Sequence, residues 1–219
     1  MFCSINGARC TKLELVIPAR GLWTADATLD DVIEFSDTSV TLALAGLTLV
    51  GAVFRRGDFS GTGSLRIVGG KGGWRKIIGQ RFYNNPHGIK LTPILTDAAS
   101  ACGETITVDA DQTIGVFFTR ENGPACRALN QLCPSWYVQP DGSTRVGDRA
   151  TPTISSRFDV VSENVAPNLG RFPIATDIPE DWVPGAKFSA PVLGSGVFQI
   201  SGVVHRLSPE RLRTEIWAA

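Results

Sequence analysis

The sequence has 219 residues and a mass of 23.5 kDa, enough for one large or two small domains with a sizeable core. Its 21 Lys and Arg cancel its 21 Asp and Glu, which argues against a nucleic-acid binder, because that mode needs a surplus of cations on one face. The longest apolar stretch, 42–54, is interrupted by Gly and Thr and is too short to span a bilayer. Since no basic segment followed by an apolar run opens the sequence, we expect no signal peptide and synthesis in the cytoplasm.

The first third of the sequence predicts β-structure. Residues 21–29 alternate polar and apolar side chains, and residues 40–44 follow the same period of two. Further short strands are expected at 12–17, 47–55 and 64–68. Short strands joined by Gly-rich turns, with no helix signal between them, favour a small barrel or sandwich.

A glycine cluster follows these strands at 69–74, with the sequence Gly-Gly-Lys-Gly-Gly-Trp. Exposed backbone N–H groups in such a loop can bind an anion. The spacing differs from the phosphate loop GxxxxGK[ST], however, and Arg75 follows Trp74 where that loop opens a helix with Ser or Thr. We therefore expect a hinge or tight turn that lets Trp74 pack back onto the first barrel.

Only the middle third predicts helices. Thr92 is a suitable N-cap, Pro93 fits the first helical position, and apolar residues then recur at helical spacing until Gly103 ends the helix. A second helix is expected over 123–132, with Pro134 just beyond its end.

Strand-like segments follow each helix, and the segment Asn84-Asn85-Pro86-His87-Gly88 before the first helix predicts a turn. The expected strands are 105–108, 115–119, 136–139 and 143–146. The last third returns to β-structure around a long loop at 165–180, with strands expected at 153–161, 187–191, 197–205 and 213–217.

The predicted fold class is mainly β with a small α+β insert, in which two barrel-like β domains flank a region with two short helices. The expected parts are an N-terminal β-barrel domain at 1–72, a helix-containing α+β region at 73–150, and a C-terminal β region at 151–219 that completes the second barrel.

Residues capable of acid–base or metal chemistry are few and scattered. The two histidines, His87 and His205, lack metal-ligand spacing and no GxSxG motif is present, so they predict an exposed turn histidine and a hydrogen-bonded strand-end histidine. A glycosidase needs two carboxylates, and the candidates are Asp30 and Asp31 with Glu34, or 180–181 (Glu-Asp), all in turn-like polar sequence. We expect no catalytic residue, no metal and no cofactor.

The five cysteines are odd in number and show no CxxC spacing, which argues against a disulfide framework or a zinc ribbon. Cys102 and Cys126 lie on apolar faces of the predicted helices, where cysteine is most often a small buried hydrophobe. Cys3 and Cys10 could pair in an oxidising milieu or stay thiols in a reducing cytosol, and residues 1–11 could be an arm to a neighbouring subunit or be disordered. The tryptophans are evenly spread, which suits core and interface anchors better than a stacking platform: Trp23, Trp74, Trp136, Trp182 and Trp217.

The order of elements and three groups of motifs resemble a known family. The motifs are LTPILTDAASACG at 91–103, ACRALNQL at 125–132 with WYVQPDG at 136–142, and VPG at 183–185 with VVHR at 203–206 and RT at 213–214. They resemble the tail hub family of bacteriophages, which includes late control protein D, the baseplate hubs of contractile phages and the base of type VI secretion spike proteins. The sequence is shorter than large hubs and lacks a needle-like β-helix or a lysozyme domain. This fits a compact hub of a siphophage or short-tailed phage better than the hub of a contractile baseplate, and we expect no membrane insertion by the chain itself.

The resemblance implies a structural virion protein made in the host cytoplasm, not an enzyme. Such a baseplate hub forms a homotrimer, closes the end of the tail tube, connects it to the tail tip and forms part of the channel for genome ejection. The implied partners are other copies of itself, a tail tube or distal tail protein, and a tail tip, spike or tape-measure protein, while DNA passes through a lumen that should avoid strong positive charge. Two alternatives remain open: a tail-tip carbohydrate- or protein-binding β module, and a peptidoglycan hydrolase.

Overall fold

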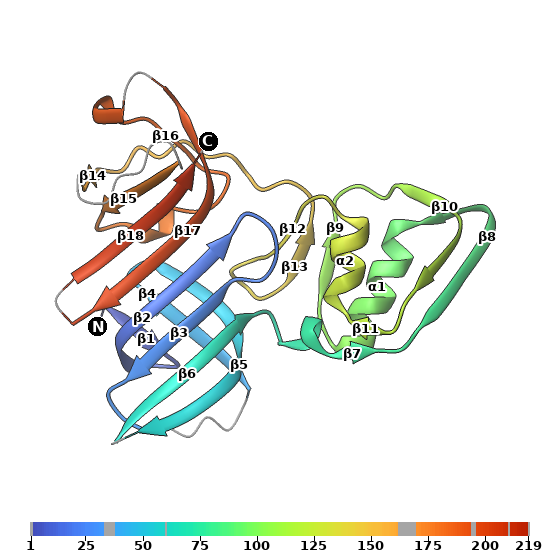
Figure 1. Cartoon of the computed structure of the whole chain (residues 1–219), viewed down its shortest axis with the longest axis horizontal. Helices are drawn as coiled ribbons and strands as arrows, with labels where there is room; N and C mark the ends of the chain where they lie inside the picture. Colours follow the sequence, from blue (N-terminus) through green and yellow to red (C-terminus); the bar gives the residue numbers. More distant parts are fainter. Residues whose placement is uncertain are drawn as a thin grey trace.

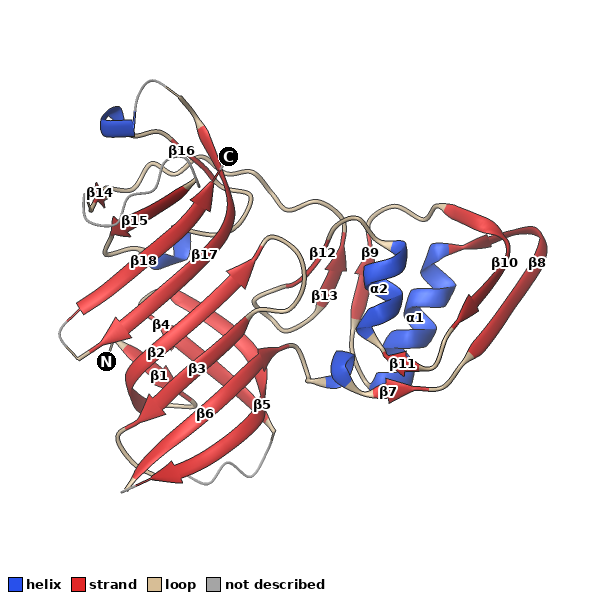
Figure 2. Ribbon diagram, in the orientation of Figure 1, coloured by secondary structure: helices blue, strands red, loops and turns tan. Residues whose placement is uncertain are grey.

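Three lobes make up the computed structural model, which describes residues 2–32, 38–59, 61–161, 170–193, 196–209 and 211–218. A barrel and a second β lobe lie beside each other, and a lobe that holds both α-helices extends to one side (Figure 1). Figure 2 shows that the remaining helical segments are short turns. The fold is therefore mainly β, with two α-helices among the described residues, as the sequence predicts. The boundaries 72/73 and 150/151 remain a prediction.

Six strands close the barrel in the order β1-β4-β5-β6-β3-β2, and β2 pairs back with β1. Their bounds are β1 (Cys3–Ile5), β2 (Ala8–Pro18), β3 (Thr24–Leu29), β4 (Ser39–Leu44), β5 (Leu47–Phe59) and β6 (Thr62–Gly69). Alternate residues of β3 and β4 are buried, as the period of two predicts. Leu15, Leu42 and Ile67 are fully buried in the barrel core.

The N-terminal residues belong to the barrel. Asn6 and Gly7 have φ values of 49° and 84° and connect β1 to β2 in a tight hairpin, for which this dipeptide is suited. Cys3 and Cys10 are both buried. The prediction that residues 1–11 form an arm or are disordered is wrong, because a three-residue strand is too short to show a periodicity in the sequence.

The second β lobe consists of β14 (Asp159–Val160), β15 (Arg171–Ala175), β16 (Lys187–Phe188), β17 (Phe198–Ser208) and β18 (Arg211–Ala218). β17 also pairs with β2, from Gly202 opposite Pro18 to Leu207 opposite Leu13. One sheet therefore runs from the barrel into the second lobe. Across this junction Arg206 Nε lies 2.9 Å from Glu14 Oε2.

Two predictions in the last third need correction. Of the strand expected at 153–161, only Asp159–Val160 is regular, with an isolated bridge from Thr153 to Lys187. The loop expected at 165–180 contains β15 and a 3-10 turn at Pro179–Asp181, while 162–169 lie outside the described residues. Proline, asparagine and glycine near β15 obscured a strand that is held by the burial of Phe172 and Ile174.

The helical lobe, called the insert below, contains ten elements. They are η1 (Gly73–Arg75), β7 (Ile77–Ile78), β8 (Arg81–Lys90), α1 (Leu91–Cys102), β9 (Ile106–Val108), β10 (Thr113–Arg120), β11 (Gly123–Pro124), α2 (Cys126–Leu132), β12 (Trp136–Val138) and β13 (Thr144–Val146). α1 ends at Gly103 with φ of 84°, as predicted. The helix begins earlier than predicted, because Lys90, and not Thr92, is the N-cap residue. Asp111 Oδ1 accepts a hydrogen bond from the Thr92 N–H at 2.9 Å.

Two further predictions in the insert are wrong. Gly123–Pro124 pairs with β7 as a short strand, and α2 begins only at Cys126. Asn84 to Gly88 lies within β8, where the register to β10 shifts between Gly115 and Phe117. Asn, Pro and Gly are tolerated there because β8 pairs on one side only and carries a bulge.

Polar contacts fix the insert to the barrel. Arg20, in the loop after β2, donates through Nη2 to the carbonyls of Asn130 and Cys133 at the end of α2, at 2.8 and 2.6 Å. The Gly21 N–H donates to the Trp136 carbonyl at 2.8 Å, and Val138 belongs to the barrel core. A cation near the last carbonyls of a helix is favourable, so these contacts stabilise the junction between the insert and the barrel. Within the described residues, no helix has the length and apolar content needed to cross a membrane.

Candidate functional site

The two histidines lie in different lobes and differ in burial. His205 is fully buried in β17, its Nδ1 lies 2.9 Å from Thr214 Oγ1, and burial lowers its pKa to about 4. Its Nε2 has no hydrogen-bond partner in the described part of the chain. His87 is exposed on β8 in the insert. The predicted hydrogen bond of His205 is present, but β17 continues to Ser208, so His205 lies within the strand and not at its end. His87 is exposed as predicted, but it lies on a strand and not in a turn.

The predicted acidic residues differ in their environment: Glu180 and Asp181 are half-buried, and Glu180 Oε2 is buried with no hydrogen-bond partner in the described part of the chain. Asp30 Oδ2 lies 3.4 Å from Arg9 Nε, Asp31 is exposed, and Glu34 lies outside the described residues. Glu180 instead reaches the turn between β4 and β5, where a Cβ on Gly46 would overlap its Oε1 atom. The arrangement gives Glu180 a packing role between the barrel and the second β lobe.

The glycine cluster wraps around a carboxylate of the chain itself. The N–H of Gly73 donates to Glu104 Oε1 at 2.6 Å and the N–H of Lys71 donates to Oε2 at 3.1 Å. A Cβ on Gly73 would overlap the carbonyl oxygen of Cys102, so the loop requires glycine there. Trp74 is fully buried in the insert core, and its Nε1 donates to Thr144 Oγ1 at 2.7 Å. The prediction that Trp74 packs onto the barrel is wrong, because the Glu104 contacts turn the loop into the insert.

The cysteines and tryptophans behave mainly as core residues. Cys102 is buried and Cys126 is half-buried in the insert. Among the described residues, no three His, Cys, Asp or Glu side chains gather as a metal site requires. Trp23, Trp74, Trp136 and Trp182 are buried and Trp217 is half-buried, so they form cores and offer no exposed stacking platform.

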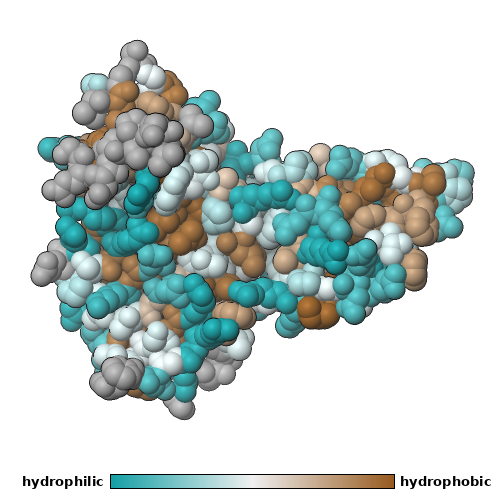
Figure 3. Space-filling view, viewed as in Figure 1, coloured by the Kyte–Doolittle hydropathy of each residue, from teal (hydrophilic) through white to brown (hydrophobic). Residues whose placement is uncertain are grey.

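An apolar surface lies on the two-stranded ribbon of β8 and β10. The exposed fractions are 66% for Phe82, 57% for Val116 and 61% for Phe117. Figure 3 shows this hydrophobic surface at the outer end of the insert. We call these three residues the ribbon face.

The opposite side of the ribbon is held by a polar network. Asp97 on α1 accepts from Tyr83 Oη at 2.6 Å and from Arg120 Nη1 at 2.8 Å. Arg120 is buried, and the rings of Tyr83 and Phe118 lie 6.1 Å apart. The ribbon is therefore fixed on α1 while its apolar residues point to solvent. Sequence analysis missed this surface, although the run Val116-Phe117-Phe118 is too apolar for a strand with only one buried face.

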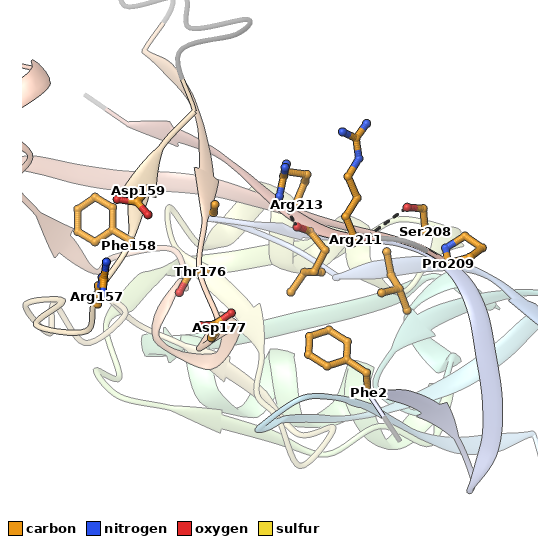
Figure 4. Close-up of a pocket in the computed structure, with 13 residues that line it drawn as sticks. Phe2, Arg157, Phe158, Asp159, Thr176, Asp177, Ser208, Pro209, Arg211 and Arg213 are labelled. Atoms are coloured by element: carbon orange, nitrogen blue, oxygen red, sulfur yellow. Dashed lines mark hydrogen bonds between the residues drawn. The ribbon is translucent and has the colours of Figure 1, made fainter.

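A hollow of about 650 Å³ lies beside the β17–β18 hairpin (Figure 4). Its apolar lining includes Phe2, Phe158, Leu207 and Leu212. Arginine and aspartate side chains provide its polar lining: Arg157, Arg211, Arg213, Asp159 and Asp177.

Comparison with known proteins gives matches of fold. No protein-family model matches the sequence, and no curated protein sequence matches it. The E. coli c3393 protein, described as a component of the type VI secretion system with structural similarity to the T4 bacteriophage tail proteins gp27 and gp5, matches with a TM-score of 0.73 and 11% identity, over 99% of this chain and 76% of that one.

Two tail proteins match over almost their whole length. The tail protein of Neisseria meningitidis MC58 has a TM-score of 0.66 and 15% identity, over 99% of this chain and 95% of that one. The 43 kDa tail protein of prophage MuSo2 from Shewanella oneidensis has a TM-score of 0.62 and 10% identity, over 99% and 96%. The chain has the fold of a phage tail protein. The tail-protein fold includes all three lobes, since 99% of the chain is aligned. The resemblance stated from sequence is thus confirmed at the level of fold.

Proposed function

We propose that this chain is a structural protein of a virion tail, a baseplate hub that closes the end of the tail tube and connects it to the tail tip. The observation that carries the proposal is the match of fold over 99% of the chain to tail proteins and to a type VI secretion component. The scattered positions of His87, His205 and the acidic pairs favour a role without catalysis.

The hub is proposed to be a homotrimer whose lumen forms part of the channel for genome ejection. A ring needs a heterologous contact, in which one face of each subunit meets a different face of the next. The ribbon face, exposed on a rigid insert, is a suitable half of such a contact. Zero formal net charge also suits subunits that pack together.

Two similar β lobes per subunit would give a trimer six similar surfaces to meet a sixfold tube. Residues 152–161 support a second barrel-like unit, because the Lys187 N–H donates to the Pro152 carbonyl at 2.7 Å and the Val161 N–H donates to the Pro173 carbonyl at 2.9 Å. This segment thus joins β16 to β15. The proposed partners are a tail tube or distal tail protein on one side and a tail tip, spike or tape-measure protein on the other, with DNA passing without specific binding.

The second candidate function is a tail-tip module that binds protein or carbohydrate. The observation that favours it is the 650 Å³ hollow beside the β17–β18 hairpin, which lies within the usual range of about 300 to 1,000 Å³ for ligand sites. Such a module would remain a monomer.

Solution mass tests the proposal. Light scattering over a concentration series is expected to give a species of about 70 kDa, three chains of 23.5 kDa, and negative-stain images of it should show a threefold ring with a lumen. A monomer at all concentrations that also forms no ring with a tail tube protein would contradict the hub. Peptidoglycan turnover that is lost in Glu180→Gln would contradict the non-enzymatic role.

A further inference from the structure

Two cysteines lie opposite each other where the barrel closes. The register of β1 on β2 pairs Ser4 with Arg9 and Ile5 with Ala8, and Cys3 and Cys10 are the next residue on each strand, close enough for their side chains to hydrogen-bond. Directly opposed residues of an antiparallel pair have Cα atoms about 4.5 to 5.5 Å apart. A disulfide joins Cα atoms about 4.4 to 6.8 Å apart, so a bond between the two sulfur atoms fits this position.

The two thiols interact and differ in acidity. A hydrogen bond between them raises the pKa of Cys3 and lowers the pKa of Cys10. Burial raises the pKa of both, and for Cys10 the hydrogen bond outweighs it. The attacking species in thiol chemistry is the thiolate. In the proposal below, Cys10 is the attacking sulfur and Cys3 is the resolving one.

The pair can be reached from the surface. Cys3 and Cys10 are 3% and 5% exposed, but both line a hollow of about 380 Å³ together with Arg9 and Thr11. The side chain of Arg9 is 70% exposed and offers a cation to a reagent that carries carboxylates. The other three cysteines belong to the insert and lie away from this hollow.

We propose that Cys3 and Cys10 are a redox modification site, a latent disulfide formed by exchange with a small disulfide such as oxidised glutathione. The Cys10 thiolate attacks one glutathione sulfur, the glutathione S–S bond breaks, and one glutathione thiolate leaves. The Cys3 thiolate then attacks the Cys10 sulfur and displaces the second glutathione thiolate. Two protein thiols are oxidised, one glutathione disulfide is reduced to two thiols, and the protons lost by the cysteines pass to the leaving thiolates.

The disulfide would stabilise the shortest strand pairing of the barrel, that of β1 with β2. β1 has three residues, and its register on β2 spans only two residue pairs. A covalent link at the third position would keep β1 in place when local opening exposes its partners. The chemistry does not depend on the proposed function, but its benefit does, because a tail assembled in a reducing cytosol would oxidise after the particle leaves the cell.

Thiol counting by intact mass tests the proposal on the 219-residue chain. The protein is equilibrated in glutathione buffers of increasing oxidised fraction, then denatured and alkylated. The reduced chain should carry five alkylated thiols, and the oxidised chain should carry three with no glutathione retained. Trypsin cleaves after Arg9, so residues 1–9 and 10–12 should be recovered as two peptides joined only by the disulfide. Five alkylated thiols at every ratio, or a bond between other cysteines, would overturn the proposal.

Three variants and one further readout sharpen the test. Cys126→Ser, the matched control, should still lose two thiols on oxidation. Cys3→Ser should retain one glutathione on Cys10, because no resolving thiol is present. Cys10→Ser should react more slowly than Cys3→Ser, and equal rates would overturn the assignment of the attacking sulfur.

Amide hydrogen exchange of β1 and β2 should slow in the oxidised wild type. Unchanged exchange would overturn the claim that the disulfide stabilises the pairing of β1 with β2. None of these readouts depends on the trimer mass, so failure of one proposal is distinguishable from failure of the other.

Discussion

At the scale of single residues, His205 couples the stability of the fold to pH. It lies on β17, which pairs with β2 and β18, opposite Leu15 and Thr214; its ring is fully buried, and one ring nitrogen has no partner among the described residues. Adding a proton would place a charge in this apolar position. The fold therefore favours the neutral imidazole.

Acid is expected to destabilise the protein through His205. The pKa is 6.5 in an unfolded chain and about 4 in the fold, so below pH 6.5 the unfolded state binds the proton first. Stability is complete above pH 6.5 and falls as the pH drops from 6.5 to 4, by about 3 kcal/mol in total from this group. Urea denaturation at pH 7, 5 and 4 measures the loss.

Two histidine variants test whether His205 causes this pH dependence of stability. His205→Gln should remove the part of the slope between pH 6.5 and 4, whereas His87→Gln, at an exposed histidine, should leave it unchanged. An unchanged slope in His205→Gln would assign the acid sensitivity to other groups.

At the scale of elements, the loop at 69–74 has the glycine-rich sequence of an anion-binding loop, but it binds a side chain of the protein itself. Its backbone donors do bind an anion, but the anion is the Glu104 carboxylate, held by Gly73 and Lys71. Glu104 follows α1 directly, so the loop and the helix end are joined. The sequence pattern could not reveal this, because the partner is about 30 residues away.

Glu104→Gln is expected to destabilise the chain by about 1 to 3 kcal/mol, because a buried charged acceptor is lost and the new amide donor can face a backbone N–H. Urea denaturation followed by tryptophan fluorescence measures the effect. Glu121→Gln is the matched control: Glu121 is 57% exposed and its Oε2 lies 2.6 Å from Arg127 Nη2, so its change should stay within about 0.5 kcal/mol. Equal stability of both variants would contradict the role assigned to Glu104.

The parts of the fold that sequence predicts are those with local periodicity. β3 and β4 alternate buried and exposed residues, and α1 carries an apolar face that ends at Gly103. β15 and β8 were missed, because their Pro and Asn residues indicate turns while distant pairing holds them extended. The ribbon face was missed for the same reason, since its exposure depends on which side of the ribbon meets α1.

At the scale of the whole molecule, the insert extends from the barrel and carries the exposed ribbon face at its outer end. Arg20 and Gly21 fix it to the barrel, and Asp97 fixes the ribbon to α1. Rigid presentation lowers the entropy cost of association. The ribbon face is therefore the part of the monomer surface where substitution should affect assembly most and folding least.

The double variant Phe82→Ser with Phe117→Ser is expected to keep the unfolding midpoint of the monomer and to raise the concentration needed for trimer formation at least tenfold, because exposed aromatic residues are frequent hot spots. Light scattering over a dilution series measures the shift. Val197→Ser is the control, since Val197 is 68% exposed but lies in the second β lobe. The same concentration dependence in both variants would exclude the ribbon face from the contact between subunits.

The pairing of β2 with β17 also has a consequence for synthesis. The barrel strands are complete by Gly69, but β2 gains its partner in the second lobe only when Phe198–Ser208 has left the ribosome. Contacts so distant in sequence slow folding. A nascent chain halted before that point would carry an open strand edge on a finished barrel, a surface that invites aggregation or chaperone binding.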